Sequence, residues 1–384
     1  MSGSQSTQYR LPAEWEAQEA VWIAWPHHVS DWSPKFSAIA WVYAELARLF
    51  AGSQTVRILV RDARQQAAAT RALLQTDPGI FAPCGQALSD DACSGRLKGP
   101  AGDVEFFQTP TNRSWTRDFM PAFVTGCGQD AGKGAALHFR FDGWSRYPNH
   151  QADDAAGAFC ARWVARQPGW EHVEVWQQER RVTLEGGALD VNGRGSILVS
   201  EECLLDAQTQ VRNPGYGRAD YEELFQTWFG CPNTLWLNRG IAGDDTHGHV
   251  DDFCRFVGPR TVVLCQEQDP SDPNHAALEE NRERLEGLRL ENGGSIEIVR
   301  LPMPRPVHFE TLRLPASYAN FFIANRLVAV PTFNDVADRE ALGILSELFP
   351  ERVVVGVHAR DLVLGLGTIH CLTHEQAALS APGV

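Results

Sequence analysis

The stretch "RVTLEGGALDVNGRGSILVSEECLL", residues 181–205, decides which fold we expect. Its two halves are short, apolar and rich in β-branched residues, and "NGRG" (192–195) between them is typical of a turn joining two strands. A helix is expected next, over "RADYEELFQTWFG" (218–230), and then another strand at "TLWLN" (234–238). Two strands, a helix and a strand follow one another, which is the order of an α/β unit.

The same kinds of segment alternate along the rest of the chain. Apolar residues at helical spacing predict helices, and short apolar runs predict strands. Helices are expected over 36–52, 152–167, 275–294 and 337–350, and strands over 55–62, 104–110, 135–142, 254–258, 261–267, 321–335 (two strands) and 352–357. No exact repeat period is present, so the alternation predicts a mixed α/β chain without establishing a repeated fold.

Composition limits the classes of partner. The 384 residues are 43% hydrophobic, and 34 basic against 48 acidic side chains give a net charge of −14, which disfavours nucleic acid and anionic membranes. We find neither a signal peptide nor a run of about 18 apolar residues. Nine cysteines without a CxxC pair predict free thiols in the cytoplasm. Residues 1–10 are expected to be flexible, and the polar segment 84–103 to be a surface loop.

Aspartate and histidine are concentrated in "DDTHGHVDDF", residues 244–253. If the backbone is extended here, His249 and Asp251 project to the same face, because strand side chains repeat every two residues. This arrangement suits a proton-transferring imidazole beside a carboxylate that holds a cation. A metal site formed by His247, His249 and Asp251 is one alternative, and a solvated polar turn is another.

Three further stretches place reactive side chains beside glycine or tryptophan. "SWTRDFMP" (114–121) contains Asp118, "LEGG" (184–187) contains Glu185, and "GTIHC" (367–371) ends on Cys371. A surface salt bridge, a hairpin end and a buried thiol would also explain these three patterns, because a lone cysteine is most often a small buried hydrophobe. The glycine-rich patterns that cradle nucleotide phosphates do not occur.

Taken in order, these stretches resemble the agmatine deiminase family, which includes the bacterial peptidyl-arginine deiminases and lies within the guanidino-group-modifying superfamily. The resemblance extends from "LPAEWEAQEAVWIAWPH" (11–27) to "GLGTIHCLTHEQ" (365–376). It implies a five-bladed, pseudo-symmetric α/β propeller (pentein) of ββαβ-like units with a central active site. It also implies a single catalytic domain over residues 1–384.

The resemblance implies the chemistry as well. A guanidinium group would be hydrolysed to a ureido group with release of ammonia, through a covalent amidino-thioether on Cys371. Asp118 and Asp251 would hold the planar cation. His249 would transfer protons, and Glu185 would orient His249. The resemblance implies no metal and no organic cofactor.

The expected mouth of the pocket departs from the usual family pattern. Asp245 and His247 belong to "DDTH", where Asp-Glu-Thr-Asp is usual, and Arg113 stands where acids or amides are favoured. Together with Trp115, these residues are expected to bind substrate. An acid at the mouth favours the distal ammonium of agmatine, whose product would be N-carbamoylputrescine. Arg113 would instead suit arginine or another carboxylate-bearing guanidino compound.

Several alternatives remain open on the sequence alone. An amidinotransferase would use the same thiol intermediate, a metal-dependent hydrolase would use the histidines, and a binding protein would keep the pocket without catalysis. The expected partner is a small cationic guanidino substrate, with neither nucleic acid nor membrane involved. A homo-oligomer is compatible with the sequence.

Overall fold

The computed structural model describes residues 9–76, 81–83 and 92–379. The α-helices are α1 (Phe36–Ala51), α2 (Ala63–Thr76), α3 (Thr116–Phe119), α4 (Gln151–Val164), α5 (Glu201–Leu205), α6 (Arg218–Phe229), α7 (Pro273–Gly287) and α8 (Asp338–Leu348). Short 3-10 helices are η1 (Val29–Trp32), η2 (Gly128–Asp130), η3 (Gly186–Ala188), η4 (Val250–Asp252) and η5 (Leu362–Gly365).

The strands of the first half are β1 (Tyr9–Arg10), β2 (Gln18–Ala24), β3 (Thr55–Val60), β4 (Ala82–Pro83), β5 (Cys93–Lys98), β6 (Val104–Gln108), β7 (Ala122–Gly126), β8 (Gly134–His138), β9 (Trp170–Glu174), β10 (Trp176–Gln177), β11 (Arg180–Arg181) and β12 (Leu189–Val191). Those of the second half are β13 (Ser196–Ser200), β14 (Asn233–Leu237), β15 (Cys254–Phe256), β16 (Thr261–Gln266), β17 (Glu297–Pro302), β18 (His308–Phe309), β19 (Leu312–Arg313), β20 (Phe322–Ile323), β21 (Leu327–Thr332), β22 (Val353–His358) and β23 (His374–Ala377).

One arrangement of strands recurs in five sheets of the described part of the chain. An antiparallel pair is followed by a helical connection and by a third strand that runs parallel to the second. The sheets β7–β8–β9, β12–β13–β14, β15–β16–β17 and β20–β21–β22 have this form. In the fifth, β23 pairs antiparallel with β2, which runs parallel to β3. The mixed α/β class predicted from the sequence is therefore confirmed.

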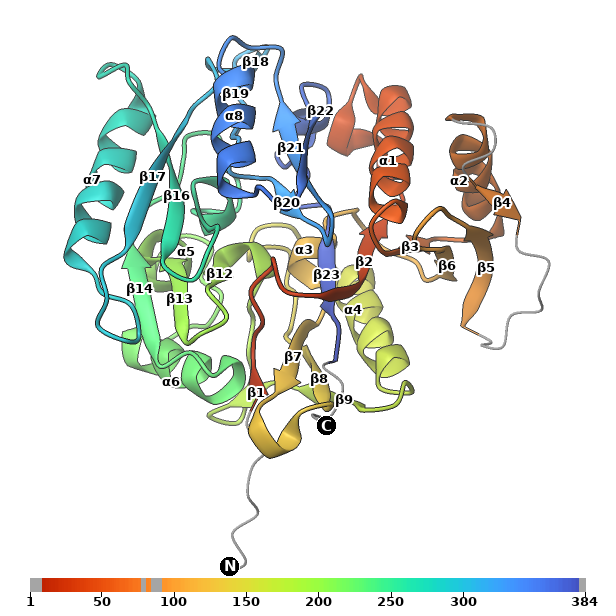
Figure 1. Ribbon diagram of the computed structural model, residues 1–384, viewed down its shortest axis with the longest axis horizontal. Coiled ribbons are helices and arrows are strands. Elements are labelled where there is room, and N and C mark those ends of the chain that lie inside the picture. Colours follow the sequence, from red (N-terminus) through yellow and green to blue (C-terminus); the bar gives the residue numbers. More distant parts are fainter. Residues whose placement is uncertain (1–8, 77–80, 84–91, 380–384) are drawn as a thin grey trace, which may run out of the picture.

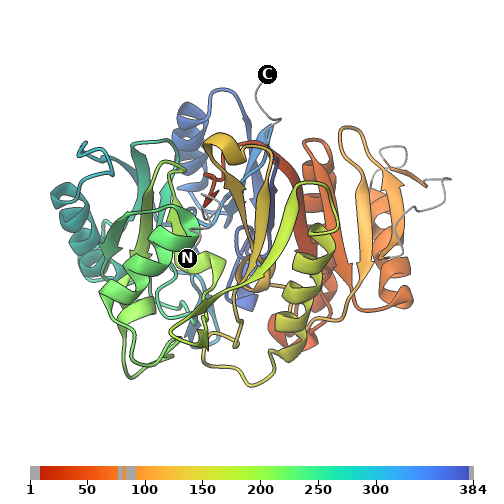
Figure 2. The same ribbon diagram turned by 90° about the horizontal axis from the view of Figure 1, so that it is seen from below.

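Pairing of β23 with β2 joins the two ends of the chain. The same sheet continues through β3, β6, β5 and β4, and with α2 these strands extend the molecule at the right of Figures 1 and 2. In Figure 1, helices α1, α4, α6, α7 and α8 lie around the outside, whereas α3 lies near the middle. Because this pairing is antiparallel, with His374 opposite Trp22, the loop that precedes β23 is held beside the end of β2.

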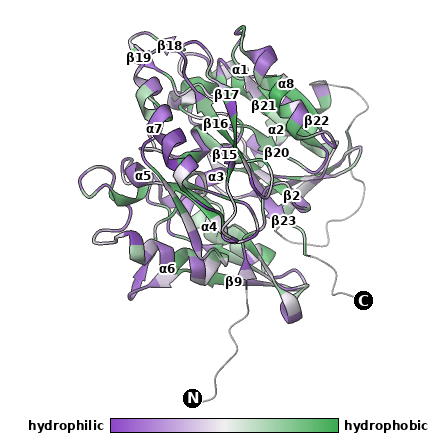
Figure 3. Cartoon of the chain, turned by 60° about the vertical axis from the view of Figure 1, so that its left-hand side comes forward, coloured by the Kyte–Doolittle hydropathy of each residue, from purple (hydrophilic) through white to green (hydrophobic). Residues whose placement is uncertain are grey.

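Local sequence explains these elements. All five residues of β13 are buried, because this strand lies between β12 and β14 and is covered on both faces. Helix α1 ends at Gly52, as its sequence predicts. Helix α7 is hydrophilic over most of its visible surface in Figure 3, as expected of a helix on the outside. Within the described residues, we find no helix with the length and apolar character needed to cross a bilayer.

Two predictions about local order need correction. The surface loop expected over 84–103 is wrong for Cys93–Lys98, which form β5 and pair with β6 because alternate residues of this segment meet the core. Residues 84–91 lie outside the described residues, as do 1–8. Tyr9 and Arg10, expected to be flexible, form β1 and pair with Gly126 and Thr125 of β7.

A buried cation connects several of the repeated units. Arg255, in β15, is fully buried, and its guanidinium donates to the carboxylates of Asp190 and Glu14 and to the backbone oxygen of Phe321. These partners belong to β12, to the segment before β2, and to the segment before β20. A guanidinium is stable in such a place when its donors are all partnered.

We predict that Arg255→Met destabilises the fold severely. The substitution keeps an unbranched side chain but leaves the carboxylate of Asp190 buried without its cation, which should lower the free energy of unfolding by about 3–5 kcal/mol. Urea denaturation measures the loss. Arg305→Met is the control, since that guanidinium is exposed in its pair with Asp335 and should matter little. Equal effects of the two substitutions would contradict the prediction.

Candidate active site

Five side chains from separate segments meet in the middle of the molecule. Asp118 lies in α3, Glu185 precedes η3, His249 and Asp251 lie at η4, and Cys371 lies in the loop before β23. The Sγ atom of Cys371 is 3.8 Å from Oδ2 of Asp251. His249 lies with Nδ1 3.8 Å from Oδ1 of Asp118 and with Nε2 3.9 Å from Oε2 of Glu185. All five side chains are buried.

Gly187 leaves the space in which three of these side chains meet. Its backbone N–H donates to Oδ1 of Asp118 at 3.0 Å. A Cβ atom at this position would lie 2.5 Å from Nδ1 of His249, 2.9 Å from Oδ1 of Asp118 and 3.1 Å from Oδ2 of Asp251. The second glycine of "LEGG" is therefore required by close approach of other segments to the backbone.

Glu185 is held by an arginine that the sequence analysis did not single out. Nε of Arg212 donates to Oε1 of Glu185 at 3.1 Å, and both side chains are fully buried. Burial favours the neutral acid, but Arg212 and His249 outweigh it and lower the pKa of Glu185 to about 2. The carboxylate is thus ionised. Its distance from His249 exceeds that of a hydrogen bond, so it acts on the imidazole through charge in this arrangement.

His249 lies in negative surroundings. Burial opposes a positive imidazolium, but Asp118, Cys203 and Glu185 together outweigh it, so the pKa of His249 is raised well above its ordinary value. The condition of an extended backbone is not met here, because Val250–Asp252 form the 3-10 helix η4. The side chains of His249 and Asp251 nevertheless approach the same point, the position that a Cβ of residue 187 would take.

The surroundings of Cys371 favour a protonated thiol in the free protein. Burial raises its pKa well above the ordinary value, and the charges of Asp251, Asp252 and Asp118 raise it further. The side-chain amide of Asn320 donates to Sγ at 3.1 Å and acts in the opposite direction. An added positive charge in the site would therefore favour the thiolate.

The histidine next to Cys371 belongs to a buried chain of three groups. Nδ1 of His370 is 2.6 Å from Oδ2 of Asp251, and Nε2 is 2.7 Å from Oε2 of Glu14. Burial and the charges of Arg117 and Arg255 lower the pKa of His370 well below its ordinary value, which favours the neutral imidazole. The contact with His370 fixes one oxygen of Asp251. The other oxygen, Oδ1, is buried without a hydrogen-bond partner among the described residues.

A pocket of about 340 Å³ opens above Cys371. Asp118 and Cys371 form part of its lining, with Trp115 and Trp144 as aromatic walls. Nε1 of Trp144 donates to Oδ2 of Asp118 at 2.9 Å and so fixes this carboxylate. Leucine and phenylalanine side chains line the outer part, at Phe309, Leu312, Leu364 and Leu366.

The residues expected at the mouth separate into two groups. Arg113, Trp115 and Asp245 line the pocket. His247 is not among the lining residues that the structure describes, and its Nε2 instead lies 2.9 Å from Oδ2 of Asp206. The expectation that His247 binds substrate has no support from this geometry, because Asp206 draws the imidazole away.

Two of the mouth side chains are already engaged by neighbours. Arg113 donates to Oδ1 of Asp31 at 2.6 Å and stacks over the ring of Tyr147, with 4.4 Å between Cζ and the ring centroid. The hydroxyl of Tyr147 donates to Oδ2 of Asp245 at 2.6 Å. Two acids and one base therefore face the mouth, so its formal charge is negative.

Sequence reasoning missed the residues that hold the site together: Glu14, Asp31, Trp144, Tyr147, Arg212, Asn320 and His370. Glu14 is one of three acids in "LPAEWEAQEA" (11–20), and Arg212 lies in a loop. Neither carries a local pattern that marks it. His370 lies inside a stretch that was singled out, "GTIHC", so proximity to a motif was the one available signal for it, and Asn320 directly precedes the strands expected over 321–335.

Two groups of possible metal ligands occur at the site within the described residues: Glu185, Cys203 and His249, and Asp251, Asp252 and Cys371. The trio His247, His249 and Asp251 that the sequence offered as a metal site is not among the groups found there, since His247 turns toward Asp206. Arg212 already neutralises Glu185, so a divalent cation in the first group would meet a fixed positive charge.

Comparison with known proteins gives consistent matches over almost the whole chain. Residues 10–377 match the model of the family described as Porphyromonas-type peptidyl-arginine deiminase. The agmatine deiminase of Pseudomonas syringae pv. syringae is 30% identical, and that of Stutzerimonas stutzeri 31% identical, each over 96% of this chain and 96% of the relative.

Solved structures agree with the sequence matches. A Cys-to-Ser variant of the C. jejuni agmatine deiminase with substrate bound has a TM-score of 0.79 and 26% identity, and the match covers 98% of each chain. The agmatine deiminase of Enterococcus faecalis shares the fold with a TM-score of 0.82, at 24% identity over 99% of each chain.

We predict that Cys371 stays protonated in the free protein at neutral pH, because burial and three carboxylates raise its pKa. The difference in thiolate absorbance between the wild type and Cys371→Ser should stay flat from about pH 6 to about pH 9, around the ordinary thiol pKa. Cys127→Ser, at a partly exposed cysteine, is the control. A thiolate step at Cys371 near pH 7 would contradict the prediction.

Proposed function

Since this chain belongs to the Porphyromonas-type peptidyl-arginine deiminase family, we propose that it hydrolyses a guanidinium group to a ureido group with release of ammonia. The observation that carries the proposal is the convergence of Asp118, Asp251 and His249 around Gly187, with Sγ of Cys371 3.8 Å from Asp251, below one pocket. Agmatine is the proposed substrate, by analogy with the relatives named agmatine deiminase, and N-carbamoylputrescine the product.

Two carboxylates would hold the substrate cation. Asp118 faces the pocket, and the unpartnered Oδ1 of Asp251 is available to accept from a guanidinium N–H. The bound cation offsets the charges that raise the pKa of Cys371, so the substrate itself promotes formation of the thiolate. The resting thiol is thereby protected from other electrophiles until a guanidinium arrives.

The Cys371 thiol gives up its proton to water in the pocket as the cation binds, the thiolate then attacks the guanidinium carbon, and a C–S bond forms. His249, whose raised pKa keeps it protonated, gives a proton to the leaving nitrogen, the C–N bond breaks and ammonia departs. The neutral imidazole next takes a proton from water, which attacks the amidino-thioether carbon. The C–S bond breaks, the hydroxyl proton of the intermediate passes to the departing sulfur, and the ureido product leaves. Ionised Glu185 stabilises the imidazolium in the first step.

We predict that Cys371→Ser abolishes ureido product at saturating agmatine while the urea-denaturation midpoint changes little, because serine is close in size and its hydroxyl is a poor nucleophile here. Colorimetric detection of ureido groups measures the product. Cys127→Ser should keep full activity. Turnover by Cys371→Ser would sink the proposed mechanism. A new guanidino compound formed on adding glycine, in place of ammonia, would indicate the amidinotransferase instead.

The tail of the substrate would meet the acids at the mouth. Asp31 already engages the charge of Arg113, which leaves Asp245 to favour a distal ammonium over a carboxylate. This supports agmatine over arginine. A carboxylate-bearing substrate would need Arg113 to exchange its partner, and the aromatic face of Tyr147 holds the guanidinium in place.

We predict that the protein uses agmatine in preference to arginine, N-acetylarginine and guanidinopropionate. The rate of ammonia release from each compound measures this preference. Asp245→Asn should raise KM for agmatine about tenfold or more, the cost of losing one charged hydrogen bond, with kcat little changed. Glu267→Gln, at an acid away from this pocket, is the control. Preference for the carboxylate-bearing compounds, lost in Arg113→Ala, would assign the tail to Arg113 and overturn agmatine as substrate.

The arrangement of the five repeated units supports a finer proposal about the fold. We propose that they are the blades of a pseudo-symmetric propeller in one domain, with the site at its centre. The helices around the outside and α3 near the middle in Figure 1 are consistent with it. The cysteines of the described residues are free thiols, which is consistent with a proposed cytoplasmic location.

A further inference from the structure

A second pocket, of about 320 Å³, lies between the β7–β8–β9 and β12–β13–β14 units. Its lining includes four arginines, Arg140, Arg180, Arg181 and Arg212, and shares no residue with the pocket above Cys371. Such a concentration of one charge is unexpected in a chain whose net charge is −14. The volume is at the lower end of the range for small-molecule sites.

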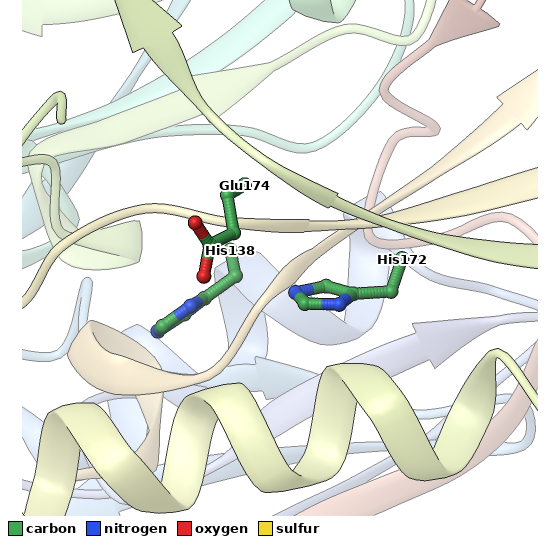
Figure 4. Close-up of side chains that lie close together, drawn as sticks. All are labelled: His138, His172 and Glu174. Carbon is green, nitrogen blue, oxygen red and sulfur yellow. The ribbon is translucent and has the colours of Figure 1, made fainter. Parts of the chain in front are cut away.

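Two of the four guanidiniums are already matched by acids. Arg212 pairs with Glu185. Arg181 lies 3.3 Å from Oε1 of Glu174 and 3.2 Å from Nδ1 of His138. Figure 4 shows these two partners, with His172, between the strands and helix α4. This trio has the residue types of a metal site, but the guanidinium of Arg181 already contacts two of its three members.

The other two guanidiniums have no such match. Arg140 and Arg180 are exposed, and neither forms an ion pair within 4.0 Å with any acid of the described residues. Arg180 donates to the backbone oxygen of Pro214 at 3.3 Å, which leaves its charge uncompensated. The hydroxyl of Thr183, on the pocket lining, makes no hydrogen bond within the described part of the chain. The guanidiniums of Arg140 and Arg180 therefore face the pocket without a paired acid, and the hydroxyl of Thr183 lines it without a hydrogen-bond partner among the described residues.

We propose that this pocket binds a small molecule through a doubly charged phosphate group. A phosphate monoester carries a charge of about −1.5 to −2 near neutral pH, which matches the two unpaired guanidiniums. Arginine presents paired donors that fit phosphate oxygens. A dicarboxylate has the same total charge, but its two groups are separate and cannot place three oxygens around one point.

An anion bound in this pocket would affect the active site through Arg212. This side chain lines the pocket and also donates to Glu185, whose low pKa depends on it. The Arg212 guanidinium is buried and donates to Glu185 and to the backbone oxygens of Gln210 and Thr246, so an anion in the pocket acts on it through charge. That charge offsets the effect of Arg212 on Glu185 and therefore weakens the stabilisation of the His249 imidazolium. The phosphate should thus lower kcat without competing with substrate, a consequence that rests on the proposed function.

Calorimetric titration with inorganic phosphate tests the site at constant ionic strength set with chloride, because anion sites are screened by salt. The wild type should bind phosphate, and Arg140→Ala/Arg180→Ala should bind it at least tenfold more weakly. Arg260→Ala is the control, since it is also exposed and lies outside the pocket. Equal affinity of the double variant, or succinate binding as tightly as phosphate, would overturn the proposal.

Binding and catalysis can be separated in this design. The binding measurement on Cys371→Ser should match the wild type, whether or not the chain proves to be a deiminase. In the kinetic measurement, phosphate should lower kcat for the wild type and leave KM unchanged, and the double variant should lose this inhibition. Competitive inhibition, or loss of phosphate binding when agmatine saturates the protein, would place the anion above Cys371 and overturn the separate site.

Discussion

The carboxylate of Glu14 is the interaction on which the geometry of the site depends. It accepts from the backbone N–H of Ile323 at 2.6 Å and from Arg255 at 3.0 Å, and it lies 2.7 Å from His370 and 3.4 Å from Arg117. Each partner belongs to a different segment, from α3 to the loop before β23. A buried carboxylate with this many donors has one low-energy arrangement, so it fixes how the segments meet.

The same network sets the charge of the site. On one side of Asp251, two arginines and a histidine surround Glu14. On the other side, Asp118, Asp251 and Asp252 lie around Cys371 with few compensating cations, and they hold its thiol protonated. A pocket with this excess of negative charge binds a cation without further recognition groups, because the positive charge of the substrate itself neutralises the carboxylates. Binding and activation of the nucleophile would then be one event.

Sequence patterns predicted the strands and helices well, because burial periodicity and glycine stops are local signals. The family resemblance, rather than these patterns, named the five side chains that meet at the centre. The condition of an extended backbone at His249 and Asp251 is not met, since a turn presents them. Long-range partners were missed altogether. Arg212 meets Glu185 across 27 positions and Glu14 meets His370 across 356, and no local pattern encodes such a contact.

At the mouth of the pocket, neighbouring side chains compensate for the departures from the family pattern. His247 stands where an acid is usual, yet Asp206 and Glu202 draw its imidazole out of the pocket. Arg113 faces the pocket, yet Asp31 balances its charge and Tyr147 holds its plane. A substitution that changes the charge of one side chain therefore changes the charge of the pocket only when neighbouring side chains do not compensate for it. With Asp31, Arg113 and Asp245 taken together, the mouth keeps one net negative charge, which is the property that a cationic tail would sense.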